Sequence, residues 1–391
     1  MDQAILIIGA GPVGLSLATA LTRQGLPVII FEQGNSIAKE IRASTFHPAT
    51  MEKMDEWGVI DAVLEQGYRV NHLQFWDRQE RRIVGDFDYT AIAEDTKYPF
   101  RLQCPQHVYA ETLLEKLQSN PLVTIHFNHE FIACQDTQHG VQAEFKTSSG
   151  FKAFSGRWLC GADGANSALR RFLNLGFEGM TYEDRFLLVG TDLNLSTYYP
   201  GIAPVSYIFD PEEWVITLQL NGLLRIVFQV KDGQDAEAEL QDANIRRRVW
   251  QFLGEQRDFP ILHKSIYRVH QRVADTFRVG RSLLLGDAAH INNPASGMGM
   301  NSGILDAACL SEKLGEAIRL QQDGPLDEYS DLRRAYALDK IKHYTKQRYQ
   351  DLSASDPKSR RARNEQYQDI SQDRKRSRDF LLHAAMLEHR I

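Results

Sequence analysis

Short apolar runs separated by a segment with helical spacing open the chain. Residues 4–8 and 27–32 are almost continuously apolar, as in strands that are buried on both faces. Between them, residues 15–24 have helical spacing, and Gly25 follows as a helix stop. The pattern predicts a β-α-β unit at the start of a parallel sheet.

The next part of the chain changes its spacing several times. Residues 42–64 have helical spacing around a break at Pro48 and Gly58. Residues 70–100 are strand-like and rich in aromatic side chains, and residues 106–118 return to helical spacing. A helical region, a strand-rich region and a further helix are therefore expected here.

Two strand-rich blocks follow, at residues 123–159 and 186–230. In the second, Asn221-Gly222 separates two apolar runs and favours a two-residue hairpin. Residues 282–285 form a short buried strand, and after Gly299 the spacing is helical almost to the end. Strand-rich pieces thus alternate with pieces of the first kind, so the domains are expected to be discontinuous.

Composition and charge narrow the class of protein. Of 391 residues, 43% are hydrophobic and 25% are charged, as in ordinary globular proteins, and the net charge is −6. Such a mild charge gives no reason to expect nucleic-acid binding. The sequence has no run of about 18 apolar residues, so no integral membrane segment is expected. The four cysteines are far apart and lack a metal-ligand spacing, which favours a cytoplasmic location.

The G-x-G-x-x-G fingerprint of dinucleotide binding stands at Gly9, Gly11 and Gly14, between the first strand and the first helix. Gly9 permits the tight turn, Gly11 lets the backbone approach a pyrophosphate, and Gly14 lets the helix pack near the strand. Glu32 ends the second strand, 18 residues after Gly14, where a carboxylate binds ribose hydroxyls. Three neighbours are expected to take part in binding: Pro12, Val13 and Gln33.

Two later motifs also follow predicted strands. Asp163-Gly164 precedes Ser167 and Arg170, and by itself is equally a turn before a capped helix. Gly286-Asp287 offers a carboxylate to sugar or ribityl hydroxyls. A glycine-rich loop then opens a helix, and its amides are candidates for the pyrimidine edge of a flavin. The candidate residues of that loop are Gly297, Gly299, Met300 and Asn301.

With these three motifs in this order, the chain resembles the class A flavoprotein monooxygenases, the family of p-hydroxybenzoate hydroxylase, over nearly its full length. The resemblance implies FAD as the cofactor, with Glu32 on the adenosine ribose and Asp287 at the ribityl chain or pyrophosphate. It also assigns Asp163 to FAD and NAD(P)H binding. Two further matches are Arg42, at the FAD phosphates and nicotinamide pocket, and Gln106, near the flavin.

The predicted fold class is α/β (α+β), a Rossmann-like FAD-binding domain with an interleaved, mostly antiparallel β-sheet substrate domain and C-terminal helices. The FAD-binding domain is expected at residues 1–72, 101–178 and 274–345. The substrate domain is expected at residues 73–100 and 179–273, and the C-terminal helical segment at residues 346–391.

The resemblance also implies the chemistry. NADH or NADPH binds transiently and reduces FAD, O₂ reacts with the reduced flavin, and a flavin C4a-hydroperoxide transfers one oxygen atom to a phenolic or heteroaromatic ring. The backbone carbonyl of Pro294 matches a carbonyl beside the point of oxygen transfer. The protein excludes water and places the ring.

The substrate region carries few signals. Tyr207, Gln219 and Arg225 lie on predicted strands and are candidates for the substrate pocket, with core packing as the alternative for each. Arg225 is the candidate carboxylate binder. No catalytic base is assigned, because His47, His72 and His290 are each as well explained by structural roles.

Alternatives stay open at this point. The same fold serves tailoring or antibiotic-modifying oxygenases of polycyclic substrates, and reductases that need no O₂ chemistry. A non-catalytic protein on this scaffold would not need intact Gly11, Glu32 and Asp287. The expected partners are a small aromatic substrate, O₂ and, as a possibility, a second copy of the chain.

Overall fold

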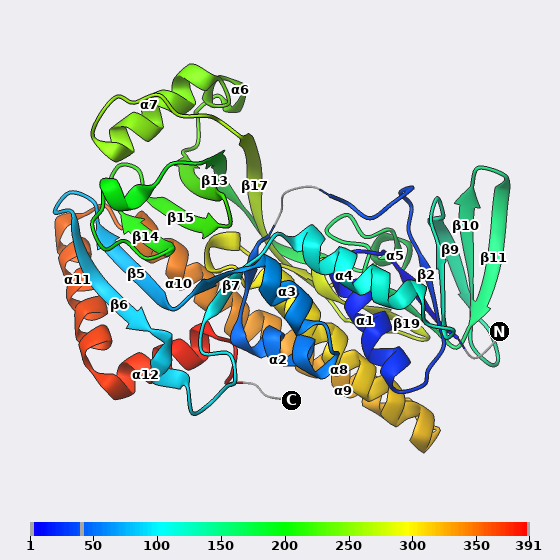
Figure 1. Ribbon diagram of the computed structural model, residues 1–391. Helices are drawn as coiled ribbons and strands as arrows, with labels where there is room; N and C mark the ends of the chain where they lie inside the picture. The colour runs from blue at the N-terminus through cyan, green and yellow to red at the C-terminus, as the bar shows by residue number, and fades with distance from the viewer. Residues whose placement is uncertain (1–3, 40–42, 389–391) are drawn as a thin grey trace.

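The fold has two lobes, each built on its own sheet (Figure 1). The computed structural model describes residues 4–39 and 43–388, with the backbone alone at residues 340–342. The first lobe contains a six-stranded sheet that is parallel except at β18. In spatial order its strands are β18 (Arg278–Val279), β19 (Ser282–Leu284), β12 (Trp158–Gly161), β1 (Ile5–Ile8), β2 (Val28–Phe31) and β8 (Val123–His126).

The second lobe contains an eight-stranded sheet that is antiparallel except for one parallel pair, β14 with β5. The predicted hairpin at Asn221-Gly222 is confirmed: it joins β15 to β16, with Gly222 at φ +66°. In spatial order the strands are β20 (His290–Ile291), β17 (His263–Ala274), β13 (Phe177–Thr191), β16 (Leu223–Val230), β15 (Val215–Leu220), β14 (Val205–Phe209), β5 (His72–Asp77) and β6 (Arg82–Asp88).

Helices cover both sheets, and their bounds follow the sequence pattern well. Asp356 caps the helix that begins at Pro357, since its carboxylate accepts a hydrogen bond from the Ser359 amide at 2.9 Å. The helices of the first lobe are α1 (Pro12–Arg23), α2 (Pro48–Glu56), α3 (Ile60–Gln66), α4 (Gln106–Gln118), α5 (Ala168–Phe172), α8 (Gly299–Leu320) and α9 (Gly324–Tyr336). Those of the second lobe are α6 (Ala236–Glu239), α7 (Asp242–Leu253), α10 (Lys342–Ser353), α11 (Pro357–Gln372) and α12 (Arg374–Ala384). Short turns of other helix types are η1 (Tyr89–Ile92), η2 (Leu195–Thr197), η3 (Gly286–Ala288), η4 (Pro294–Ser296) and η5 (Ala337–Ile341).

A small three-stranded sheet lies where the lobes meet, and it corrects one prediction. Its strands are β3 (Thr45–Phe46), β7 (Arg101–Gln103) and β4 (Tyr68–Val70). Residues 43–47 are therefore not helical, because Thr45 and Phe46 pair with β7 and the helix starts only at Pro48. Arg42, a predicted phosphate and nicotinamide contact, lies outside the described residues.

The C-terminal helices pack on one face of the eight-stranded sheet, with α11 and α12 at its outer edge (Figure 1). Tyr367 of α11 stacks on Phe75 of β5 with ring centroids 4.2 Å apart, and Phe380 of α12 stacks on Phe87 of β6 at 4.1 Å. The apolar tip at residues 380–387 joins the core of this sheet, and its Ala385 carbonyl accepts a hydrogen bond from the Ala49 amide of α2 at 3.2 Å.

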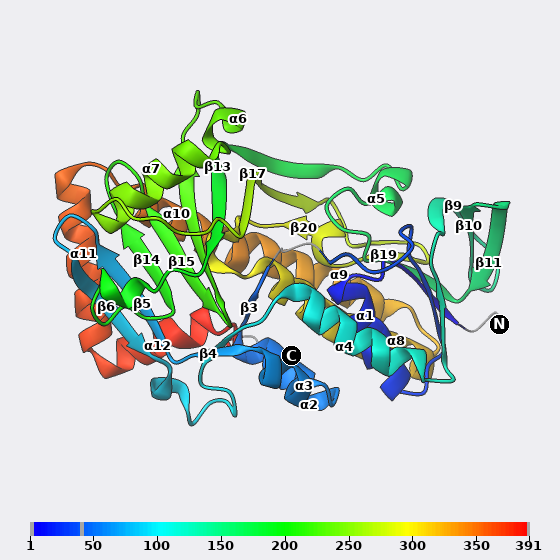
Figure 2. The same ribbon diagram turned by 45° about the horizontal axis from the view of Figure 1, so that its top comes forward.

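Helix α7 covers the opposite face of the eight-stranded sheet, so both faces are buried. The third small sheet consists of β9 (Glu130–Asp136), β10 (Val141–Thr147) and β11 (Gly150–Gly156), which project from the far end of the first lobe (Figure 2). Among the described helices, none has a stretch apolar enough and long enough to span a membrane. The mixed α/β fold class is as predicted, while the division into three domains stays a prediction.

Candidate functional site

The three glycine motifs, far apart in the sequence, meet at the carboxyl ends of β1, β12 and β19. The Ala162 amide donates to the Ile8 carbonyl at 2.8 Å, and the Leu285 amide donates to the Gly161 carbonyl at 3.1 Å. A Cβ added to Gly286 would lie 3.1 Å from the Val13 side chain, so the third motif packs on the first. Ligands of open α/β sheets bind at this edge.

The turn after β1 has the geometry that a pyrophosphate requires. Gly9 has φ +101°, and a Cβ there would lie 2.4 Å from the Ala162 carbonyl oxygen, so no other residue fits. A Cβ on Gly11 would meet nothing within 4 Å, which leaves its backbone open to approach. No side chain caps the first turn of α1, so its amides face outward with the positive end of the helix dipole.

Glu32 is fixed at the end of β2 by two backbone amides. Its Oε2 accepts from the Ala10 amide at 2.9 Å, and its Oε1 accepts from the Gly34 amide at 2.9 Å. The side chain is only partly buried. Each oxygen keeps a lone pair after these bonds, so the carboxylate can still receive sugar hydroxyls.

Asp163 and Arg170 tie the second motif to its surroundings. Asp163 Oδ2 accepts from the Ala168 and Leu169 amides at 2.7 and 3.1 Å, while its buried Oδ1 has no partner among the described residues. Arg170 donates to the Ala288 carbonyl at 2.7 Å and lies 3.7 Å from the ring centroid of Phe177. Arg170 therefore links this motif to the third one.

The third motif rests on a buried charge cluster. Asp287 itself is exposed, on the turn η3 that starts at Gly286 with φ +60°. Beneath it, the fully buried Asp306 carboxylate accepts from the Gly286 amide at 2.9 Å, from His290 at 2.8 Å and from Arg333 at 2.5 Å. Burial opposes ionisation, but Arg333 and His290 outweigh it and lower the pKa of Asp306 to about 2. His290 is thus structural, as expected.

The loop that follows is held by the small sheet. Asn301 donates to the Thr45 and Gly297 carbonyls at 2.8 Å each, and it accepts from the His47 amide at 2.9 Å. Its side chain is therefore used for protein contacts that hold the loop, and its predicted part in cofactor binding stays a prediction. Gly297 has a φ of +66°, and a Cβ added to it would contact the Thr45 side chain. Gly299 and Met300 begin α8, which has no side-chain cap.

Three further predicted site residues are Gln106, Gln33 and Pro294. Gln106 starts α4, where its amide donates to the Ala43 carbonyl at 3.0 Å, and Gln33 lies exposed after β2. Pro294 is exposed and its carbonyl accepts from the Gly297 amide at 2.9 Å, which leaves one lone pair for a ligand. The buried Ser296 Oγ and Asn292 Oδ1 have no hydrogen-bond partner within the described chain. A dinucleotide with a flavin at this loop fits these features.

A family profile described as an FAD binding domain matches residues 2–343. The chain belongs to the FAD-dependent aromatic monooxygenases. It is 30% identical to para-nitrophenol 4-monooxygenase of a Pseudomonas species, over 99% of this chain and 96% of that protein. It is 28% identical to 6-hydroxy-3-succinoylpyridine 3-monooxygenase of Pseudomonas putida, over 85% and 83% of the two chains.

Solved structures agree with this membership. The crystal structure of p-nitrophenol 4-monooxygenase from Pseudomonas putida matches with a TM-score of 0.90 and 28% identity, covering 100% of this chain and 99% of that one. Aklavinone-11 hydroxylase, solved with FAD, matches with a TM-score of 0.79 at 24% identity, a likeness of fold. This flavoprotein is therefore an FAD-dependent enzyme of the hydroxylase fold, and oxygen insertion into an aromatic ring is the activity of its family.

On the substrate side, Tyr207 contacts the loop at residues 294–301, called the flavin loop below, whereas Arg225 contacts Ser44 and Gln219 contacts neither. The Tyr207 hydroxyl donates to the Ala295 carbonyl at 2.6 Å. Arg225 is buried and donates to Ser44 Oγ at 3.1 Å, and burial lowers its pKa to about 10. Gln219 points to the other face of β15, because Leu218 beside it packs toward the loop. The Gln219 amide bonds to the Leu220 carbonyl at 2.8 Å.

His72 also lies away from the flavin loop. Its Nδ1 lies 2.9 Å from the Asp86 carboxylate on a partly exposed strand, so it is a surface pair. His47 differs, since it is fully buried and its Nε2 lies 3.2 Å from the Gly297 carbonyl. Because a carbonyl accepts, Nε2 carries the proton of the neutral ring, and Nδ1 is a buried acceptor without a partner in the described chain.

His47 makes the fold sensitive to acid. Burial first, and Arg101 second, lower the pKa of His47 well below 6.5. Unfolding therefore takes up a proton below pH 6.5, and the stability that the neutral ring contributes is lost as the pH falls. The slope approaches about 1.4 kcal/mol per pH unit for this one group. In the natural protein, the free energy of unfolding in urea is expected to fall between pH 7 and pH 5.5. In His47→Gln this fall is expected to be about 1 kcal/mol smaller. An equal fall in both proteins would contradict this assignment.

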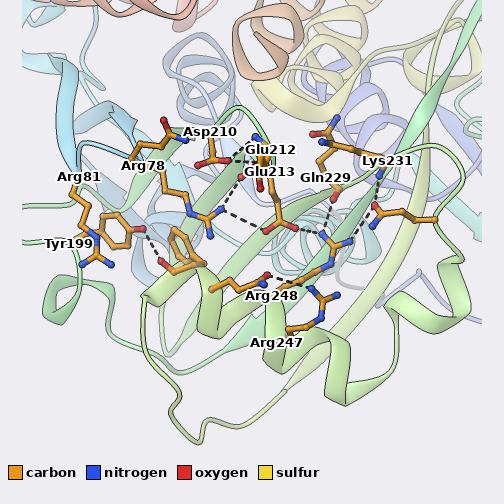
Figure 3. Close-up of a pocket in the computed structure, with 14 residues that line it drawn as sticks. Arg78, Arg81, Tyr199, Asp210, Glu212, Glu213, Gln229, Lys231, Arg247 and Arg248 are labelled. Carbon is orange, nitrogen blue, oxygen red and sulfur yellow. Dashed lines mark hydrogen bonds and ion pairs between the residues drawn. The ribbon is translucent and has the colours of Figure 1, made fainter. Parts of the chain in front are cut away.

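A cavity of about 620 Å³ lies under α7, and it is distinct from the flavin loop (Figure 3). Cations and acids alternate around it, and Arg248 pairs with Glu213 and, at 2.7 Å, with Glu239. Phe252 of this cavity belongs to the core on the α7 face of the sheet. Five cationic and three acidic side chains line this cavity, which lies on the face opposite to the flavin loop.

Proposed function

We propose that this flavoprotein uses NADH or NADPH and O₂ to hydroxylate a small phenol or hydroxylated heteroaromatic ring. The observation that carries the proposal is the aromatic wall beside the flavin loop. Tyr207 holds the Ala295 carbonyl and stacks on Phe75 at 5.3 Å, and Phe75 stacks in turn on Tyr367 of the C-terminal helices. This wall suits a single flat ring, and the relative that spans the whole chain acts on para-nitrophenol.

We infer that the predicted motif residues hold the cofactor. Gly9, Gly11 and the first turn of α1 would receive the pyrophosphate, Glu32 the adenosine ribose, and Asp287 the ribityl region. The amides at Gly299 and Met300 would meet the flavin ring. When bound, FAD supplies hydride acceptance and the activation of O₂.

The chain's own residues prepare the reacting space. The carbonyl of Pro294, on an exposed residue, keeps one lone pair that would accept a hydrogen bond from a substrate hydroxyl. Tyr207, Asn301 and His47 hold the loop that carries it, through the bonds at Ala295 and Gly297. Helices α10 to α12 cover the adjoining sheet face and exclude water from it.

The test is a panel of single-ring phenols and hydroxypyridines offered to the purified holoenzyme with NADH and with NADPH. We expect at least one such compound to speed NAD(P)H oxidation by about tenfold or more, with matching O₂ uptake and a hydroxylated product. Added catalase measures uncoupled peroxide. If only polycyclic phenols act, the substrate class is wrong. If NAD(P)H is oxidised without O₂ uptake into product, the reductase alternative holds instead.

A further inference from the structure

Arg101 is a buried cation that the sequence pattern did not single out. It starts β7 and is 2% exposed. Its Nε donates to the hydroxyl of Tyr89, which is itself fully buried. Tyr89 stays neutral, since burial raises its pKa to about 12. A tyrosine hydroxyl therefore supports the guanidinium without neutralising its charge.

The backbone of Arg101 lies beside the residue that holds the flavin loop, because Phe46 of β3 pairs with Leu102 of β7, so His47 and Arg101 are neighbours across these strands. The charge of Arg101 acts on His47, and Tyr207 interacts with it as well. His47 contacts the Gly297 carbonyl, and Tyr207 contacts the Ala295 carbonyl. Two neighbours of Arg101 thus touch the loop on either side of Ser296, and the aromatic wall of the proposed substrate space is formed by Tyr207 itself.

The groups around Arg101 leave its charge without a carboxylate. Tyr89 of η1, Tyr207 of β14 and Tyr344 of α10 face it, and His47 before α2 lies near. Among the described residues no carboxylate forms an ion pair with it. Two other buried arginines differ, because Arg333 pairs with Asp306, and Arg248 pairs with Glu213 and with Glu239.

Burying a guanidinium without a counter-ion costs free energy of folding, and binding of an anion next to it offsets that cost. It cannot lose its proton near neutral pH. Tyr89 fixes its orientation, so less side-chain freedom is lost on binding. These features describe a preformed anion site beside an aromatic wall.

We propose that Arg101 binds the ionised oxygen of the phenolic substrate and favours its phenolate form in the site. This inference rests on the proposed function. On ionisation the phenol O–H bond breaks, the electron pair stays on oxygen, and the proton leaves to the solvent. The ring becomes more electron-rich, which is what an oxygen-transfer reaction needs from its acceptor. Arg101 is thus a specificity-determining residue that selects ionisable phenols.

The experiment is optical titration of the holoenzyme with 4-nitrophenol, without NAD(P)H, because the neutral and ionised forms of this phenol absorb at different wavelengths. In the natural protein the bound phenol is expected to titrate at lower pH than free 4-nitrophenol. Arg101→Met is expected to bind it about 10- to 100-fold more weakly and mainly as the neutral phenol. Nitrobenzene, which has no ionisable oxygen, should bind both proteins with similar affinity.

Two further variants test the inference if Arg101→Met fails to retain FAD. Arg101→Lys keeps the charge, so it is expected to keep the shift toward phenolate. Tyr89→Phe removes the supporting hydroxyl but not the charge, so a smaller loss of affinity is expected. Unchanged affinity and ionisation in Arg101→Met, or a lost shift in a folded Arg101→Lys, would overturn the inference about Arg101 alone. Failure of the natural protein to bind any phenol of the panel would overturn the proposed function as well.

Discussion

Asp306→Asn is expected to destabilise the protein by about 3–5 kcal/mol and to weaken its hold on FAD. Asp306 is the carboxylate for the buried Arg333, and it also accepts from His290 and from the amide of Gly286. Asparagine keeps the volume but leaves the Arg333 charge uncompensated in the interior. Because Gly286 carries the turn of the third motif, the damage is transmitted to the cofactor site.

Urea unfolding of the holoenzyme and the flavin content after gel filtration measure the two effects. Glu316→Gln is the control on the same helix, because Glu316 pairs with Lys313 at 3.2 Å on a partly exposed surface. A change within about 0.5 kcal/mol is expected for it. The double variant Asp306→Leu with Arg333→Met should recover part of the lost stability, since it removes both charges. A stable, flavin-replete Asp306→Asn protein would show that the cluster does not support the site.

Gly14→Ala is expected to abolish FAD retention and to cost at least about 3 kcal/mol of stability. The added Cβ would lie 2.0 Å from the carbonyl oxygen of Gly9, which is backbone and belongs to the pyrophosphate turn. Either α1 or this turn must then move. Flavin content and the thermal midpoint of the purified variant measure the result.

Two other glycines provide matched controls for this prediction. A Cβ on Gly11 meets nothing within 4 Å, so Gly11→Ala is expected to fold normally while binding FAD more weakly, because the methyl group stands where the phosphates approach. A Cβ on Gly324 also meets nothing, and this position is far from the motifs in sequence, so Gly324→Ala should retain FAD fully. If Gly14→Ala retains FAD as well as Gly324→Ala does, the close helix–strand contact has no role in binding.

The cofactor half of the site could be predicted because each part of it is a local sequence motif. The turn from Gly9 to Gly14 and the strand end at Glu32 follow from spacing and backbone conformation within a few residues. The fold then needs only parallel pairing of β1, β2 and β12 to bring these parts together. The role of Asp306 became clear only from the structure, because its partners are distant in the sequence. Its single signal in the sequence is a carboxylate within an otherwise apolar helix segment.

The substrate half could not be predicted to the same depth because the eight-stranded sheet is buried on both faces. In β15 both Val215 and Ile216 are apolar, so alternation does not distinguish the flavin side from the α7 side. Tyr207 and Gln219 therefore looked alike as candidates, although only Tyr207 reaches the loop. Arg101 was missed because its importance depends on which distant groups surround it.

The two strands β13 and β17 run from one lobe into the other as a single pair (Figure 2). From Phe177 to Thr181, β13 pairs with β17 beside the first lobe, and from Arg185 onward both strands pair within the eight-stranded sheet, after an irregularity between Thr181 and Arg185. The lobes are thus joined by a hydrogen-bonded ribbon rather than by a free hinge. This continuous pairing opposes a large rigid-body opening of the two lobes, so we expect the substrate to enter and leave the site through local movement of side chains and loops.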